Sequence, residues 1–422
     1  MSFSEWREVV LKDVIEFNPK ESIKKGTVTK KIGMDKLAPF QRKIDGFELA
    51  EFSGGSKFRN GDTLLARITP CLENGKTAQV MILDDDEIAF GSTEYIVMRN
   101  KTGITDNNYI FYLSLSQYVR DTAIKSMTGT SGRQRAQTDV IKNTKIMLPP
   151  LQEQKAIAHI LSTLDDKIEV NNQINKTLEN MAQEIFKQWF VDFEFPNEDG
   201  ESYKSSGGEM VESELGLIPK GWEVASLYDI ADYINGTSFK KNEVNEFEGI
   251  PIIKIVEIKN GYSKSTSFYN GTTNKAKKYY LRKRDILFSW SGNPETSIDI
   301  FIWSKEQGIL NQHIFKVEPY DYSKSYIYFL LKNFKSVFMD IASNKQTTGL
   351  GHVTVADLKR LKTPIPNEEI LSEFIKISDV IIEKIFNNMQ EIETLQSLRD
   401  SLLPKLLSGE IRVPLDEEGV VS

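Results

Sequence analysis

The stretch DKIEVNNQINKTLENM at residues 166–181 returns as EKIFNNMQEIETLQSL at residues 383–398, 217 positions later and with paired asparagines at the same place. Around each copy, apolar residues recur at spacings of three, four or their sums, which is the period of an amphipathic helix. The sequence therefore predicts two long sibling helices. Their apolar stripes are Ile157, Ile160, Leu164, Ile168, Leu178, Met181 and Ile185 in the first, and Phe374, Ile377, Ile381, Ile385, Leu395, Leu398 and Leu402 in the second.

Prolines mark where these helices begin and end. The first follows LPPLQEQ at 148–154 and ends before Pro196, and the second follows TPIP at 363–366 and stops near Pro404 and Gly409. A helix of about 40 residues spans roughly 60 Å, which is more apolar length than one small domain covers. Because a folded block separates the copies, we expect them to pair as an antiparallel two-helix coiled coil.

Asn171 and Asn388 occupy matching positions within the two apolar stripes. A polar residue at such a position lowers stability but penalises wrong registers, so both are candidates for setting the helix-helix register. The alternative is that both side chains face solvent.

The segments before each long helix also resemble one another. The chain therefore reads as a tandem duplication with internal pseudo-twofold symmetry, in which each half is a mixed α/β globule followed by a long helix, and the fold class is α+β. Short aromatic helices in each globule are expected to be core. The matched segments are EWREVVLKDVIEF (5–17) with GWEVASLYDIADY (221–233), FRNGDTLLARIT (58–69) with LRKRDILFSWSG (281–292), and YIFYL (109–113) with YIYFL (326–330).

One segment between the halves, NEDGESYKSSGGEMVESELG at 197–216, is acidic, rich in Ser and Gly and without apolar period. It is predicted to be a flexible linker. The expected organisation is a first domain at 1–150, a long helix at 151–195, a linker at 196–220, a second domain at 221–366, a second long helix at 367–408 and a C-terminal tail at 409–422.

The net charge of −7 is distributed unevenly. Residues 1–150 carry a net +3 and residues 221–366 a net +5, whereas residues 151–220 carry −8 and residues 367–422 carry −7. Two mildly basic blocks thus alternate with two acidic segments. This pattern favours globular units that face a polyanion, joined by segments that face protein or solvent.

Other classes are disfavoured by composition. No apolar run approaches the roughly 18 residues of a membrane span, and the N-terminus has no signal-peptide pattern, so we expect a cytoplasmic protein. Cys71 is the only cysteine, and the three histidines show no ligand spacing, so neither a disulfide nor a metal site is expected.

Several segments carry a resemblance to a known family. LPPLQEQKAIAHIL, WFVDFEF, GLIPKGWEV (216–224), DTLLARITPCLENGK (62–76) and LLPKLLSGEI (402–411), in this order and with this duplication, resemble the DNA-specificity subunit of type I restriction and modification systems. The similarity extends over essentially the whole chain.

The resemblance implies two target-recognition domains, each of which reads one half of a bipartite, asymmetric site in double-stranded DNA. It implies that the helices set the spacing and dock two methyltransferase subunits, to which restriction subunits attach. DNA methylation and cleavage, the host-defence activities, would then belong to those partners.

The residues agree that the chain itself is not catalytic. Adenine methyltransferases carry an (Asn/Asp)-Pro-Pro-(Tyr/Phe) loop, whereas NPKE at 18–21 and NPET at 293–296 lack the second proline and the aromatic residue. FSGGSKF at 52–58 matches no phosphate or dinucleotide loop, so no cofactor is expected. DDDE at 84–87 reads as a solvated turn.

Candidate DNA contacts are Arg, Lys, Asn, Gln, Ser, Thr and His on loops able to enter a groove. The Gly-hinged loop TSGRQR could alternatively be a solvated turn, as could the lysines of NKAKK. In the first block the candidates are Arg67, Thr69, Asn74, Lys76, Thr130, Arg133, Gln134 and Arg135. In the second they are Asn274, Lys275, Lys277, Ser291, Asn293, Lys345, Gln346 and His352.

Some alternatives stay open at this point. Trp189, Phe190 and Phe193 could pack on a recognition domain or on a docked partner. The chain could also be a coiled-coil scaffold that binds only proteins, or a free-standing DNA-binding regulator. Duplex binding that weakens steeply with added salt would favour DNA contact.

Overall fold

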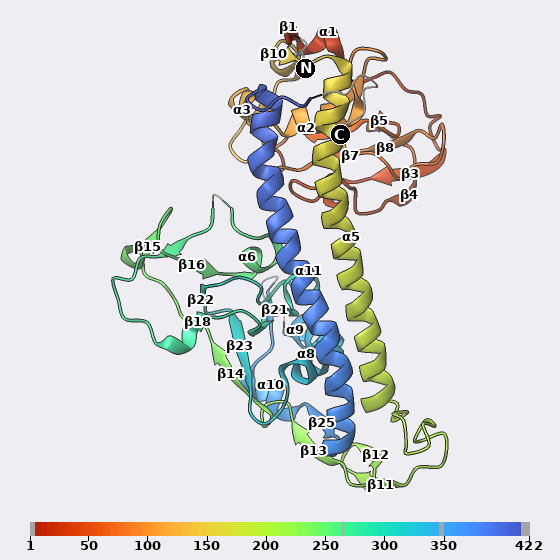
Figure 1. Ribbon diagram of the computed structural model, residues 1–422, viewed down its shortest axis with the longest axis vertical. Coiled ribbons are helices and arrows are strands. Elements are labelled where there is room, and N and C mark those ends of the chain that lie inside the picture. The colour runs from red at the N-terminus through yellow and green to blue at the C-terminus, as the bar shows by residue number, and fades with distance from the viewer. Residues whose placement is uncertain (1–4, 264, 346–349, 415–422) are drawn as a thin grey trace. The chain divides into compact units, whose positions relative to one another are not determined.

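A computed structural model describes residues 5–263, 265–345 and 350–414. The chain divides into two compact units. Unit 1 combines Met1–Val170 with Ile392–Ser422, and unit 2 is Asn171–Glu391. Each unit therefore holds one globular block together with parts of both long helices, labelled α5 and α11 in Figure 1.

The long helices are α5 (Leu151–Phe190) and α11 (Glu368–Ser408). α11 begins where the Asn367 side chain accepts a hydrogen bond from the Ile370 amide, and Gly409 follows its last turn with a φ of 77°. The helix continues through Pro404 and ends at Ser408, the last residue of the predicted second long helix. Pro404 removes only one backbone donor near the helix end, and buried Leu406 packs the last turn into the core of unit 1.

Within each unit, the α5 and α11 segments run antiparallel. In unit 2, Asn171 donates to Glu391 at 2.9 Å, and Asn388 donates to Asn175 at 2.8 Å. Residue numbers therefore rise on one helix as they fall on the other. In unit 1, Arg399 on α11 binds Asp165 on α5 at 2.7 Å.

Unit 1 contains a four-stranded antiparallel sheet in the order β2–β9–β6–β7. A second sheet has the order β4–β3–β8–β5, with β3 and β8 parallel (Figure 1), and β1 pairs with β10. The strands are β1 (Arg7–Val10), β2 (Ile15–Phe17), β3 (Val28–Ile32), β4 (Glu48–Glu51), β5 (Ser56–Phe58), β6 (Thr63–Ala66), β7 (Thr77–Gln79), β8 (Ala89–Gly91), β9 (Tyr95–Asn100) and β10 (Lys145–Leu148). The short helices are α1 (Leu11–Val14), η1 (Met34–Lys36), α2 (Asn107–Leu115), α3 (Gln117–Lys125) and α4 (Thr138–Lys142).

Unit 2 repeats this topology in the orders β14–β23–β19–β21, β15–β17–β16–β22–β18, with β16 and β22 parallel, and β13–β25. It adds the pairs β11–β12 and β20–β24. Its strands are β11 (Met210–Ser213), β12 (Gly216–Pro219), β13 (Glu223–Ser226), β14 (Ala231–Asn235), β15 (Val244–Asn245), β16 (Ile250–Ile253), β17 (Phe268–Tyr269), β18 (Tyr280–Leu281), β19 (Ile286–Ser289), β20 (Ser291–Gly292), β21 (Asp299–Ile302), β22 (Gly308–Leu310), β23 (Ile314–Pro319), β24 (Gly351–His352) and β25 (Lys362–Ile365). Its short helices are η2 (Lys241–Glu243), α6 (Ile255–Asn260), η3 (Lys277–Tyr279), α7 (Pro294–Ser297), α8 (Lys324–Asn333), α9 (Lys335–Asn344) and α10 (Val355–Arg360).

The aromatic helices are core, as predicted. α2 starts at the N-cap Asp106 and α8 at the N-cap Ser323, and each then turns a continuous run of apolar residues inward. Tyr109 and Tyr326, at equivalent places in these helices, are completely buried. A base-stacking role would need exposed rings, so it does not fit these residues.

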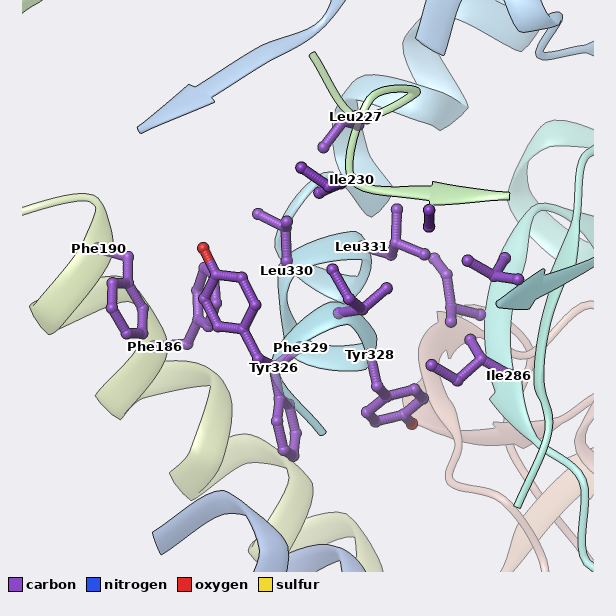
Figure 2. Close-up of a cluster of buried hydrophobic side chains, with 14 of the residues drawn as sticks. Phe186, Phe190, Leu227, Ile230, Ile286, Tyr326, Tyr328, Phe329, Leu330 and Leu331 are labelled. Atoms are coloured by element: carbon purple, nitrogen blue, oxygen red, sulfur yellow. The ribbon is translucent and has the colours of Figure 1, made fainter. Parts of the chain in front are cut away.

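The aromatic cluster at the end of α5 belongs to the core of unit 2. Figure 2 shows Phe186 and Phe190 of α5 beside Tyr326 of α8. Trp189 packs on Phe374, and Phe193 packs edge to face on Trp222. The structure thus decides between the two predictions for Trp189, Phe190 and Phe193: they complete a globular core and are not a free docking surface.

The prediction that residues 197–216 lack regular structure is wrong in part. Strands β11 and β12 form a hairpin in which Met210 pairs with Pro219, and Gly216 adopts a φ of 91° beside the turn. Ile218 of this hairpin is buried in the core of unit 2. The hairpin escaped prediction because each strand is four residues long and polar residues dominate the segment.

Candidate nucleic-acid interface

The Gly-rich loop of the first block forms a short hairpin in unit 1. The backbone groups of Thr128 and Arg135 exchange two hydrogen bonds, of 3.1 and 2.9 Å. Gly129 and Gly132 turn the chain between them with φ values of 126° and 77°, which other residues rarely adopt. We call this element the 128–135 hairpin. Thr130, Ser131 and Arg133 are exposed at its tip.

Backbone hydrogen bonds hold this hairpin against the end of β6. Ala136 donates to the Arg67 carbonyl at 2.8 Å, and Thr69 donates to the Gln134 carbonyl at 3.0 Å. Arg67 in turn donates to the carbonyl of Glu94, immediately before β9, at 3.0 Å. Three segments that are far apart in sequence therefore meet at one place, and their backbone positions are fixed by the sheet.

Three charged side chains converge there, which we call the arginine cluster: Arg67, Glu94 and Arg135. Arg135 places Nε and Nη2 on the Glu94 carboxylate at 2.7–3.0 Å, and Arg67 adds its Nε at 3.2 Å. The bond from Arg135 is the main cause that lowers the pKa of Glu94; burial opposes the shift and the bond from Arg67 adds to it. The side chains of Arg67 and Arg135 remain 33% and 42% exposed.

The other predicted residues of the first block lie on the neighbouring loop. Thr69 precedes a cis bond to Pro70, Asn74 is exposed, and Lys76 donates its Nζ to the Met34 carbonyl at 2.8 Å. The structure therefore brings Arg67, Thr69, Gln134 and Arg135 together, whereas Lys76 is engaged in bracing its own loop.

Unit 2 has the same backbone arrangement at the corresponding place. Val353 donates to the Trp290 carbonyl at 2.9 Å, and Ser291 pairs with His352 between β20 and β24. By topology, Trp290 stands where Arg67 stands, His352 where Arg135 stands, and His313 where Glu94 stands. Trp290 and His313 have ring centroids 5.8 Å apart. We call Trp290, His313 and His352 the histidine-tryptophan cluster.

The remaining candidates of the second block are dispersed. Asn274 and Lys277 are exposed, whereas Lys275 pairs with buried Glu243 at 3.2 Å. Asn293 caps α7 by accepting from two backbone amides, at 3.0 and 3.1 Å. Lys345 forms an ion pair with buried Asp357. Gln346 lies outside the described residues.

Glu94, Trp290 and His313 are not among the residues predicted from the sequence. A lone glutamate before a strand carries no motif, and its role is visible only because two distant arginines converge on it. Trp290 lies inside the matched segment LRKRDILFSWSG (281–292), but tryptophan is not among the usual base-reading residues.

Within residues 5–263, 265–345 and 350–414, no group of three or more His, Cys, Asp or Glu side chains could hold a metal ion. No helix in the same ranges is long and apolar enough to cross a membrane. The acidic turn at 84–87 is partly neutralised, since Asp84 and Glu87 both pair with Lys30, at 2.9 and 2.8 Å.

Comparison with known proteins identifies the family. Residues 3–180 and 219–399 both match the family described as "Type I restriction modification DNA specificity domain". The chain belongs to this family. The double match agrees with two repeats of one domain, and the predicted assignment as a non-catalytic specificity subunit is confirmed.

Curated relatives of this specificity subunit cover most of its length. The type I restriction enzyme MjaIX specificity subunit of Methanocaldococcus jannaschii is 31% identical over 327 residues, which cover 74% of this chain and 71% of the relative. The HindI specificity subunit of Haemophilus influenzae is 27% identical over 413 residues, which cover 84% and 87%. The type I S subunit from M. genitalium shares the fold, with a TM-score of 0.52, 14% identity and 96% coverage of each chain.

Proposed function

We propose that this specificity subunit recognises a bipartite, asymmetric sequence in double-stranded DNA through two modules, residues 1–150 and 221–366. It would direct adenine methyltransferase and restriction subunits to that sequence in the cytoplasm. One observation carries the proposal. The two family repeats share one backbone arrangement but present different side chains from it, the arginine cluster in one and the histidine-tryptophan cluster in the other. Different side chains at equivalent places would read different bases, which makes the site asymmetric.

The residues proposed to contact DNA in the first module are the arginine cluster's Arg67 and Arg135, the 128–135 hairpin and the loop with Thr69, Asn74 and Lys76. The exposed hairpin tip suits phosphate contact, and the half-exposed guanidinium groups suit base edges. In the second module, we propose that Ser291 and His352 read bases, with Asn274 and Lys277 near phosphates. Lys275, Asn293 and Lys345 would have to leave existing partners, so they are weaker candidates.

We further propose that the two long helices form one antiparallel spacer that sets the distance between the half-sites. The antiparallel contacts inside each unit support this. Asn171 and Asn388 are almost fully buried, with 1% and 2% exposure, and each bonds across to the other helix. Two buried asparagines that each bond to the opposite helix favour a single register. A shift of one helix along the other would leave both side-chain amides without their partners.

The methyltransferase subunits are proposed to dock on the long helices. Large apolar side chains are exposed there in both units, which is unusual unless another surface covers them. In unit 1 they are Val170 on α5 and Leu398 on α11; in unit 2 they are Ile174 and Met181 on α5 and Ile377 and Val380 on α11.

The test is to reconstitute the chain with its methyltransferase subunits and to map methylated adenines in random DNA. Two half-sites of different sequence at one fixed spacing are expected. Deleting the facing heptads 167–173 and 390–396 removes about 10 Å of helix, which should shorten the spacer by about three base pairs and leave both half-site sequences intact. The matched control substitutes exposed Asn172 and Gln396 by Ala without deletion. An unchanged spacer in the deletion variant refutes the spacer proposal.

A further inference from the structure

The Glu94 carboxylate is saturated by its two arginines. It accepts four hydrogen bonds from them, three from Arg135 and one from Arg67. A carboxylate has about four lone-pair positions, so little acceptor capacity remains for a base. Glu94 is therefore placed to act on DNA through the arginines rather than by direct contact.

Both arginines have N–H donors that do not bond to Glu94. A guanidinium group has five N–H donors, and these bonds use one from Arg67 and two from Arg135. Within residues 5–263, 265–345 and 350–414, Glu94 supplies the side-chain partner of both groups. The donors that remain sit on partly exposed side chains whose Nε edges are already fixed, so little conformational entropy remains to be lost when they bind.

We propose that Glu94 is a positioning residue for base discrimination: it holds Arg67 and Arg135 in one arrangement in which their free donors read guanine in the first half-site. This inference rests on the proposed function of the first module. Guanine is the base that offers two acceptors, O6 and N7, on its major-groove edge to such a fork. The histidine-tryptophan cluster contains neither an arginine nor a carboxylate, so the second half-site would not share this requirement.

The Glu94 charge affects DNA binding in two opposite ways. Glu94 brings a negative charge close to a polyanion, so it weakens sequence-independent binding while it orders the arginines. Removing that charge should therefore strengthen binding to non-target DNA and weaken discrimination at the same time. The carboxylate stays ionised at neutral pH, since the bond from Arg135 keeps its pKa low.

The experiment compares Glu94→Gln with the wild type, each assembled with methyltransferase subunits, by titrating target duplex, a duplex with one guanine of the first half-site replaced, and non-target duplex at several salt concentrations. The variant should bind non-target DNA more tightly, with a steeper salt dependence, and its discrimination against the replaced guanine should fall at least about fivefold. Discrimination at the second half-site should not change. Glu48→Gln is the matched control, because it makes the same charge change on an exposed strand of unit 1 beside Lys31. It should leave discrimination intact.

A second variant tests the same inference if Glu94→Gln fails to fold. Arg135→Lys keeps the charge but removes the planar fork, so it should lose the same discrimination without a gain in non-target binding. If both folded variants discriminate like the wild type, the inference about Glu94 is overturned while the proposed function stands. If the wild-type complex itself shows no half-site preference, the proposed function fails as well.

Discussion

Replacing Arg412 by alanine should destabilise unit 1 strongly, although this residue lies past the end of α11. Arg412 donates two hydrogen bonds, of 2.7 and 2.9 Å, to the carboxylate of Glu153 near the start of α5. The centre of its guanidinium group lies 5.3 Å from the centroid of the Trp6 ring. Trp6 donates its indole N–H to the same carboxylate at 3.0 Å. The segment just before β1, the first long helix and the C-terminal segment are thus joined at one buried carboxylate.

The expected loss in the free energy of unfolding follows from the burial of Glu153. The Glu153 side chain is 2% exposed, so removing Arg412 leaves a buried carboxylate whose remaining side-chain donor, among the residues that the structure describes, is Trp6. Breaking a buried pair in this way costs about 3–5 kcal/mol. Because 24% of the Arg412 side chain is exposed, some solvent already screens the pair, and we expect the lower end, about 3 kcal/mol.

Unfolding in urea, monitored by fluorine NMR of 5-fluorotryptophan-labelled chain, measures this loss. Trp6 is the only tryptophan of unit 1, so its resonance reports that unit separately. The double variant Glu153→Gln with Arg412→Met removes both charges and keeps an acceptor for Trp6, so it should return to within about 1 kcal/mol of wild type. Lys405→Ala, which breaks only an exposed pair with Glu410 at 3.8 Å, is the control and should cost less than about 0.5 kcal/mol. A loss below about 1 kcal/mol for Arg412→Ala, or no recovery in the double variant, refutes the reasoning.

Two further predictions concern the modules separately. Substituting Arg133 and Arg135 together by Ala should alter the methylated sequence of the first half-site alone; a change in the second half-site would contradict the assignment of these residues to one reader. In unit 2, burial raises the pKa of Asp357, but hydrogen bonds from Lys345 and Thr354 outweigh it and lower the pKa to about 2. The unfolded value is about 4, so this stability is complete above pH 4 and is lost as pH falls towards 2. Urea unfolding at several pH values should show this loss in the wild type, and a flatter profile in Asp357→Asn.

The long helices show what local pattern can predict. An apolar residue every three or four positions requires only that the backbone be helical, so the stripes around Ile168 and Ile385 were sufficient to place α5 and α11. Pro404 does not end α11, because packing around Leu406 overrides its local preference, and the helix reaches Ser408 as predicted. The hairpin at 210–219 was missed because burial of Ile218 against the aromatic core decides its order, and that core is assembled from distant segments.

The residues proposed to read DNA show where such prediction stops. Residue type and loop position selected Arg67 and Arg135 but could not show that one carboxylate holds both. Likewise, Asp165 lies outside the apolar stripe of the first long helix, yet it accepts a hydrogen bond from Tyr112 at 2.6 Å and pairs with Arg399. These partners are separated by tens to hundreds of positions, so no window of sequence contains them.

The sequence by itself determined the duplication, the two amphipathic helices and the family, because period, order and repetition are properties of the chain read along its length. The tertiary structure alone decided which charges neutralise one another and which backbone segments meet at each proposed DNA-reading site. Those outcomes depend on distances between residues that only the folded sheets bring within hydrogen-bonding range.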